Sequence, residues 1–390
     1  MGIKNDFLWD LSEKLISFDT VSFKSNSQAS SYIADILQDL GFKTHIDHYS
    51  DHGVKKEQVV AWIGPEVSGG LILSGHMDTV PFENQSGWSK DALKLTLEND
   101  KIYGRGTCDM KIFIAHCLAA FKELNLENLK KPLVCVFTSD EEVGCLGANK
   151  LTPKLERILG EIPVPKRAVV GEPTEFKMIH SHKGVVQFDV TLRGIAGHSS
   201  RPDLGRNAIE MARQVIQLSE TFNQKFSMTS TSENREDFPE FPYNHFHLAY
   251  INGGQAANMI PNECHLKFSY RTFPNDDPLR LFFEFKQAIE QKLYSDEEYI
   301  QIKLNRMTKA MPKCSDHELE NVLSALTGSH NHSVAYATDG GEFASHGIQT
   351  YICGAGSIQQ AHMPDEFIEV EQYERGKEFV TDIIQKLLMA

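Results

Sequence analysis

Short apolar runs that alternate with a helical stretch are the feature that most restricts the fold of this chain. Three runs, 70–74, 133–138 and 168–170, are brief and rich in Val, Ile or Leu, as buried parallel strands tend to be. Between the first two lies 112–124, an apolar helical stretch long enough to connect one parallel strand to the next. This alternation predicts an α/β domain whose central sheet is mostly parallel.

A different pattern begins near residue 183. Residues 187–192 alternate polar and apolar side chains, as a half-exposed strand would, and the order strand, helix, strand, strand, helix, strand follows up to about residue 306. That order is typical of a ferredoxin-like α+β domain. From about 307 the α/β pattern resumes. Because 390 residues exceed what one core usually organises, we expect a first domain made of 1–181 and 307–390, with 182–306 inserted into it.

The charge and composition narrow the class of partner. A formal net charge of -14 argues against nucleic acid or an anionic membrane, because both need a concentrated basic face. No apolar stretch is long enough to span a membrane, and residues 1–10 carry Lys4, Asp6 and Asp10 rather than the apolar core of a signal peptide. The seven cysteines are scattered, with no CxxC spacing. We therefore expect a cytoplasmic protein with a small-molecule substrate and no nucleic-acid or membrane partner.

Residues that bind metal ions follow each of the three predicted strands. His76 and Asp78 come after the first run, Glu141 and Glu142 after the second, and Glu172 after the third. In open α/β sheets, sites lie beyond the carboxyl ends of the strands. His and carboxylate ligands without a thiolate fit zinc or a similar ion with a position left for water. The sequence therefore predicts a catalytic metal site at this edge of the sheet.

Six motifs in order resemble those of the dinuclear M20 metallopeptidases, and among these the acetylornithine deacetylases. The matching segments are 75–81, 103–111, 140–142, 171–174, 197–200 and 361–366. The resemblance implies a zinc-peptidase-like α/β catalytic domain formed by 1–181 and 307–390. It also implies that the inserted domain, 182–306, acts as a lid and dimerisation domain.

The resemblance further implies two divalent ions per subunit, Zn²⁺ or Co²⁺, held by five residues. One ion would be held by His76 and Glu172, the other by Glu142 and His362, and Asp109 would bridge them. A bridging carboxylate is needed because two cations about 3.5 to 4 Å apart repel each other strongly. Asp78, two residues from His76, would orient the imidazole and fix its tautomer.

The same resemblance assigns the remaining catalytic and substrate-binding roles. Glu141 would be the general base that takes a proton from water and returns it to the departing amine. His198 would stabilise the oxyanion in the site of a partner subunit, which implies a homodimer. The expected substrate contacts are Arg271, Asn258, Lys183 and Thr338. The guanidinium of Arg271 suits an α-carboxylate, because it can donate two parallel hydrogen bonds to it.

The segment 354–366 is most like that of the acetylornithine deacetylases, which favours hydrolysis of N2-acetyl-L-ornithine to ornithine and acetate in arginine synthesis. The segment 337–342 fits only some members, although Asp339 or Glu342 would suit the side-chain amine. Three alternatives stay open. They are a succinyl-diaminopimelate desuccinylase, another acyl-amino-acid hydrolase or dipeptidase, and a non-enzymatic relative that keeps the fold for binding, which the complete ligand set disfavours.

Overall fold

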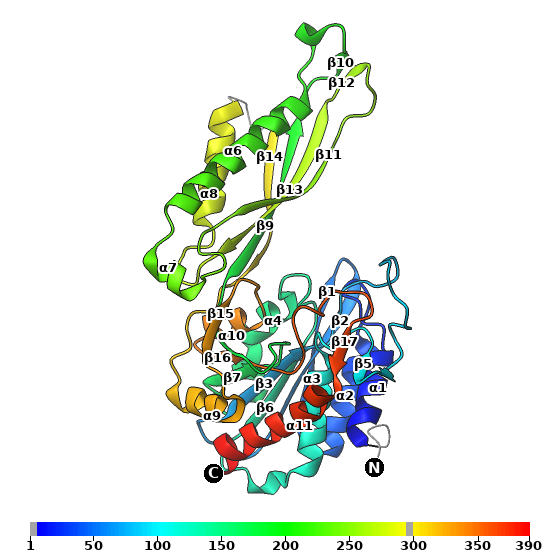
Figure 1. Ribbon diagram of the computed structural model, residues 1–390, viewed down its shortest axis with the longest axis vertical. Coiled ribbons are helices and arrows are strands. Elements are labelled where there is room, and N and C mark those ends of the chain that lie inside the picture. Colours follow the sequence, from blue (N-terminus) through cyan, green and yellow to red (C-terminus); the bar gives the residue numbers. More distant parts are fainter. Residues whose placement is uncertain (1–5, 294–298) are drawn as a thin grey trace. The chain divides into compact units, whose positions relative to one another are not determined.

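The computed structural model describes residues 6–293 and 299–390, and its internal contacts divide them into two compact units (Figure 1). Unit 1 comprises residues up to Ser181, Lys313–His332 and Thr338–Ala390, and unit 2 comprises His182–Pro312 and Ser333–Ala337. From the sequence we placed the two boundaries after residues 181 and 306. Residues 1–5, on which part of the signal-peptide argument rests, lie outside the described residues.

Unit 1 is built on an eight-stranded sheet with the order β1-β2-β6-β3-β7-β16-β8-β15. In that order the strands are β1 Lys43–Asp51, β2 Val54–Ile63, β6 Leu133–Thr138, β3 Leu71–His76, β7 Arg167–Val170, β16 Gln349–Ile352, β8 Met178–His182 and β15 Asn331–Val334. The central strands β6, β3, β7 and β16 are parallel neighbours, whereas β1, β2 and β8 pair antiparallel. The expected α/β fold with a parallel centre is confirmed.

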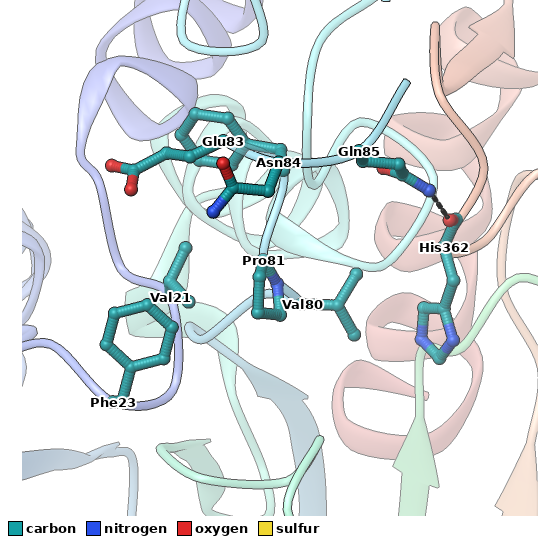
Figure 2. A pocket seen from close by; sticks show the side chains of 9 residues that line it. Val21, Phe23, Val80, Pro81, Glu83, Asn84, Gln85 and His362 are labelled. Carbon is teal, nitrogen blue, oxygen red and sulfur yellow. Dashed lines mark hydrogen bonds between the residues drawn. The ribbon is translucent and has the colours of Figure 1, made fainter. Parts of the chain in front are cut away.

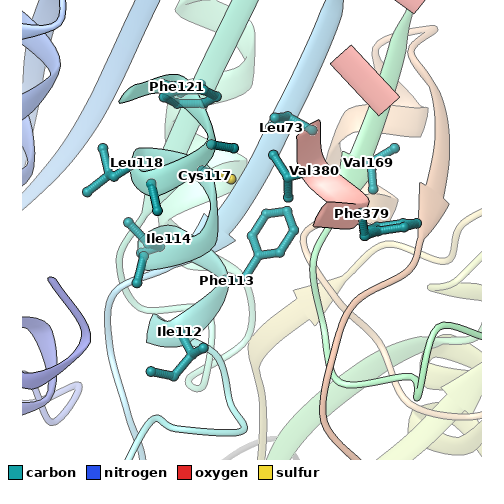
Figure 3. Packing of buried hydrophobic residues seen from close by; sticks show 14 of the residues in the cluster. Leu73, Ile112, Phe113, Ile114, Cys117, Leu118, Phe121, Val169, Phe379 and Val380 are labelled. Carbon is teal, nitrogen blue, oxygen red and sulfur yellow. The ribbon is translucent and has the colours of Figure 1, made fainter. Parts of the chain in front are cut away.

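Helices pack on this sheet, and a small sheet, β17-β5-β4, adds Phe367–Glu369, Lys101–Tyr103 and Thr96–Glu98. The unit 1 helices are α1 Phe7–Ser17, α2 Ser27–Asp39, α3 Lys111–Glu123, α4 Leu146–Leu151, α5 Leu155–Leu159, α9 His317–Thr327, α10 Gly340–Ser345 and α11 Val370–Ile384. Helix α3 is buried over nearly its whole circumference. Its Phe113 and Cys117 pack toward Leu73 of β3 and Val380 of α11 (Figure 3). This packing fixes the start of α3, which lies two residues after Asp109.

Unit 2 contains a four-stranded antiparallel sheet with the order β11-β13-β9-β14. Its strands are β9 Gly184–Arg193, β11 Phe246–Gly253, β13 Glu263–Thr272 and β14 Ile300–Thr308, and its helices are α6 Ala208–Met228, α7 Ser232–Asp237 and α8 Arg280–Leu293. Helices α6 and α8 cover one face of the sheet around a cluster of phenylalanines (Figure 1). The chain order and strand order are those of the ferredoxin-like fold expected from the sequence. A separate two-stranded sheet pairs β10, Gly197–His198, with β12, Met259–Ile260.

Among the described residues, the structure has no helix long and apolar enough to cross a membrane. All seven cysteines lie within those residues and are buried as free thiols.

Candidate metal centre

The strand ends bring the predicted metal ligands together in unit 1. His76 is the last residue of β3 and lies opposite Thr138 of the parallel neighbour β6, after which Glu142 follows. Glu172 follows β7, the neighbour on the other side of β3. Asp109 precedes α3, and His362 lies in the connection between β16 and β17. Parallel strands therefore place three ligands at one sheet edge, and two further segments add the other two.

Asp109 occupies the centre of the cluster. Its Oδ1 lies 2.9 Å from His76 Nε2, and its Oδ2 lies 3.3 Å from His362 Nε2. The cluster also brings His362 Nε2 to 2.9 Å from Glu142 Oε2, and His76 Nε2 to 3.9 Å from Glu172 Oε1. Each oxygen of Asp109 thus faces a different histidine, which is the arrangement that a bridging carboxylate requires.

The electrostatics of the cluster favour a bound cation. Burial raises the pKa of Glu141 well above its ordinary value, and the charge of Glu172 raises it further. Burial and the neighbouring Asp109 raise the pKa of Glu142 to about 7. Burial alone would lower the pKa of His76, but the hydrogen bond with Asp109 and the charge of Glu172 raise it. Carboxylates gathered in a buried space repel one another, and a divalent cation would relieve that repulsion. The donor set therefore fits the metal ions that the sequence implies.

Asp78 orients His76 differently from our expectation. His76 Nδ1 lies 3.0 Å from the backbone carbonyl oxygen of Asp78 and 3.7 Å from its carboxylate. Because a carbonyl oxygen only accepts, a neutral His76 ring carries its proton on Nδ1, and the Nε2 lone pair faces Asp109. The Asp78 carboxylate accepts instead from the backbone N–H groups of Glu141 and Glu142, at 3.1 and 3.2 Å, and from Ser22 Oγ at 2.8 Å. It therefore holds the turn that carries Glu141 and Glu142.

Glu141 lies within the same cluster. One of its oxygens and ligand atoms of His76 and Glu172 lie within 4.8 Å of one another. The Cys145 thiol donates to Glu141 Oε1 at 3.3 Å. Asp339, whose carboxylate accepts from Thr138 Oγ1 at 2.5 Å, adds a further negative charge that raises the pKa of Glu141. A carboxyl group with a raised pKa suits proton transfer near neutral pH.

A pocket of about 550 Å³ opens beside the cluster, and His362 forms part of its wall (Figure 2). Val21, Phe23, Val80 and Pro81 make this wall largely apolar. Ligand access to His362 is therefore possible from within unit 1 alone.

The residues predicted in unit 2 form two groups. Asn258 and His198 are neighbours, because the Asn258 carbonyl accepts from Ser199 N–H and His198 pairs with Met259. The β9–β13 ladder has one end at Arg193 and Glu263, which is the end nearer to His198 in the chain. Arg271 pairs with Val185 near the opposite end, close to Lys183. The ladder pairs ten residues of each strand, roughly 30 Å at the rise of a β-strand. Within one copy of unit 2, His198 and Arg271 thus lie at opposite ends.

Two predicted substrate contacts have structural partners. Lys183 is fully buried, and its Nζ donates to the carbonyl oxygens of Phe241 at 2.5 Å and Tyr243 at 3.3 Å. Thr338, in unit 1, is also buried, and its Oγ1 accepts from Gly340 N–H at the start of α10. Asp339 and Glu342, considered for the substrate amine, are buried as well.

The sequence reasoning assigned no role to Glu366, although it closes the last motif. Glu366 is fully buried, and its Oε1 accepts from the N–H groups of Cys108 and Asp109 at 2.8 and 3.0 Å. Its Oε2 pairs with Arg105 Nη1 at 2.7 Å. Glu366 therefore fixes the backbone of Asp109, the residue at the centre of the cluster. The only signal in the sequence was its position as the last residue of the motif that contains His362.

Comparisons with known proteins agree with this geometry. The sequence pattern of peptidase family M20/M25/M40 matches residues 72–386. The chain is 34% identical to an acetylornithine deacetylase of Myxococcus xanthus over 93% of the chain and 92% of that protein. It is 32% identical to an acetylornithine deacetylase of Yersinia pestis over 94% of the chain and 92% of that protein. The fold is similar to that of an M20 family metallo-carboxypeptidase from Sulfolobus solfataricus, with a TM-score of 0.77 at 18% identity, covering 98% of this chain and 99% of that one.

Proposed function

The chain belongs to peptidase family M20/M25/M40, the family expected from its motifs, and is a hydrolase. From that premise we propose that it removes the acetyl group from N2-acetyl-L-ornithine, giving ornithine and acetate in arginine synthesis. The single observation that carries the proposal is Asp109, whose two oxygens face His76 and His362 beside the buried Glu141. The names of relatives at 31 to 34% identity support the choice of substrate. The free, buried cysteines suit a cytoplasmic location.

In the proposed site, His76 and Glu172 would hold one divalent ion, Glu142 and His362 the other, and Asp109 both. Zn²⁺ or Co²⁺ suits this set of imidazole and carboxylate donors. When bound, such ions supply Lewis acidity, which makes water easier to deprotonate and polarises an acyl oxygen.

Glu141 performs the proton transfers in this proposal. Its carboxylate accepts a proton from the attacking water and gives it to the nitrogen of the departing amine, which is too basic to leave unprotonated. The Asp78 carboxylate fixes the position of Glu141 by accepting from its backbone N–H.

His198 supplies a hydrogen-bond donor. Its Nδ1 accepts from the backbone N–H of Ser200 at 3.2 Å, so a neutral ring carries its proton on Nε2. The ring is exposed, and this N–H is suited to an oxyanion. Arg271 would pair with the substrate α-carboxylate, and Asn258 lies beside His198. Since Lys183 already donates to two carbonyl oxygens, we assign it the positioning of the 238–243 segment near Arg271. Thr338 holds the start of α10 in unit 1 by accepting from Gly340 N–H.

A homodimer would combine the two groups of unit 2 residues in one site. Within one copy, His198 lies beyond the Arg193–Glu263 end of the β9–β13 ladder and Arg271 lies near its other end, so a site that uses both draws on two copies. The edge strand β11 exposes Tyr250 and Ile251, each about half accessible, which suits pairing with a second copy.

The substrate proposal is tested by loading the purified protein with Zn²⁺ or Co²⁺ and comparing rates on three substrates. We expect N2-acetyl-L-ornithine to have a higher kcat/KM than succinyl-diaminopimelate or a dipeptide. A preference for either of the other two would overturn the substrate while leaving the hydrolase in place.

The shared site is tested by mixing two inactive variants, His198→Ala and Glu141→Gln, under conditions that exchange subunits. If each site uses the partner's His198, about one site in four in a statistical mixture recovers every wild-type group. No recovery, with subunit exchange shown by mass, would contradict the shared site.

A further inference from the structure

The connection that carries His362 needs support from elsewhere in the fold. The side chain of His362 is 54% exposed, whereas those of His76, Asp109, Glu142 and Glu172 are 7% exposed or less. No helix or strand of at least three residues lies between β16 and β17, so the segment 353–366 has little backbone ladder of its own. Its backbone hydrogen bonds near His362 are those of short turns, such as Met363 N–H to the Gln360 carbonyl oxygen at 3.3 Å. Side-chain hydrogen bonds from other segments therefore add to the support of His362.

The segment 85–90 provides these hydrogen bonds at two points. Gln85 Nε2 donates to the backbone carbonyl oxygen of His362 at 2.6 Å, the contact drawn in Figure 2. Three residues further on, the Asp365 carboxylate accepts from Ser89 N–H and Ser89 Oγ, at 2.7 and 2.6 Å, and from Lys90 N–H at 3.1 Å. The His362 segment is thus held on both sides of Met363.

Gln85 also connects this segment to Asp109. Its Oε1 accepts from Arg105 Nη2 at 2.6 Å and from Trp88 Nε1 at 3.0 Å. Arg105 in turn pairs with Glu366, which accepts from the backbone N–H of Asp109. An unbroken series of hydrogen bonds therefore runs from the carbonyl of His362 to the backbone of the central carboxylate.

The amide of Gln85 is chemically required for this series. Arg105 and Trp88 can only donate, so the oxygen of Gln85 must face them. The His362 carbonyl can only accept, so the nitrogen of Gln85 must face it. A carboxylate at this position would still accept from Arg105 and Trp88, but it could not donate to the His362 carbonyl oxygen.

We propose that Gln85 and Arg105 are positioning residues that set the spacing of His362 and Asp109, and that the amide of Gln85 thereby determines the affinity of the cation position held by His362 and Glu142. This inference rests on the metal centre proposed above. It does not depend on which acyl amino acid is the substrate.

The test is the variant Gln85→Glu, which keeps the acceptor for Arg105 and Trp88 and removes the donor to His362. Zn²⁺ affinity is measured on the metal-stripped protein by competition with a chelating fluorophore. The wild type is expected to bind two ions with distinct affinities. In Gln85→Glu the affinity of one position should fall about tenfold, with the other nearly unchanged, as for other residues that orient metal ligands.

The matched control is Asn84→Asp, which adds the same charge on the exposed neighbouring residue. We expect it to leave both affinities unchanged, because it removes no contact to His362. An equal change of affinity in both variants would show that the loss of the Gln85 donor is not the cause and would overturn the proposal, as would a Gln85→Glu protein that binds both ions like the wild type.

A second variant separates positioning from folding. Gln85→Met removes the donor and the acceptor together, and should weaken both positions, because Arg105, which pairs with Glu366, also loses its acceptor on Gln85. Wild-type-like circular dichroism and thermal midpoints are expected for both Gln85 variants. If the wild type itself binds no ion, the metal centre and this inference fail together. If the wild type binds two ions but does not hydrolyse N2-acetyl-L-ornithine, only the proposed substrate is wrong.

Discussion

Replacing His116 with glutamine should make the folded protein less sensitive to acid. His116 lies in α3 and is almost fully buried, and its Nε2 donates to the carbonyl oxygen of Tyr373 in α11 at 2.7 Å. Burial lowers the pKa of the imidazole from 6.5 to about 4, against the opposing effect of that hydrogen bond. The neutral ring is therefore the form that the fold accommodates.

The size and sign of the effect follow from the two pKa values. Between pH 6.5 and 4 the unfolded chain binds a proton at His116 that the folded chain does not. This contribution to stability is complete above pH 6.5 and is lost as the pH falls toward 4. At 1.36 kcal/mol per pKa unit, lowering the pH from 7 to 5 should cost about 2 kcal/mol through this residue.

The assay is urea unfolding at pH 7 and pH 5, with a chelator present so that metal binding does not contribute. His116→Gln keeps an N–H donor for the Tyr373 carbonyl and cannot titrate. The difference between the two pH values should be about 2 kcal/mol smaller in His116→Gln than in the wild type. Equal pH dependence in the two proteins would show that His116 does not titrate with a lowered pKa in the folded state.

Two further predictions concern the supports of the site. A Cβ at Gly376 would lie 2.1 Å from His116 Cε1, so Gly376→Ala should lower the free energy of unfolding by about 1 to 3 kcal/mol in urea, and an unchanged midpoint would contradict this packing. Glu366→Gln breaks the buried pair with Arg105, which should cost about 3 to 5 kcal/mol in the same assay; a loss below about 1 kcal/mol would show that the pair is not the main support of the Asp109 turn.

The sequence predicted the features that depend on local pattern. Residues 133–138 read as a buried strand and form β6, and the carboxylates just after it lie at the sheet edge where parallel strands place them. The ferredoxin-like order of unit 2 was also readable, because its strands alternate and its helices have apolar faces. In each case a short stretch of sequence is enough to predict the strand or helix.

Contacts between distant segments were not predictable in this way. The Gln85–His362 and Arg105–Glu366 hydrogen bonds join residues more than 250 positions apart, and no spacing in the sequence encodes them. The same holds for Asp78, where the motif shows the residue but not which of its oxygens faces His76. The hairpin of β1 and β2 was missed because its first strand is polar and largely exposed at the edge of the sheet.

If the unit 1 cluster is a hydrolytic metal centre, removing the base at Glu141 should abolish turnover without removing the metal. The variant Glu141→Gln keeps the shape of the side chain and removes the base. Turnover of N2-acetyl-L-ornithine and zinc content per subunit should be measured on the same preparation. We expect a zinc content equal to that of the wild type and a rate at least about 100-fold lower. A near-normal rate in a fully loaded variant would show that Glu141 is not the base of this centre.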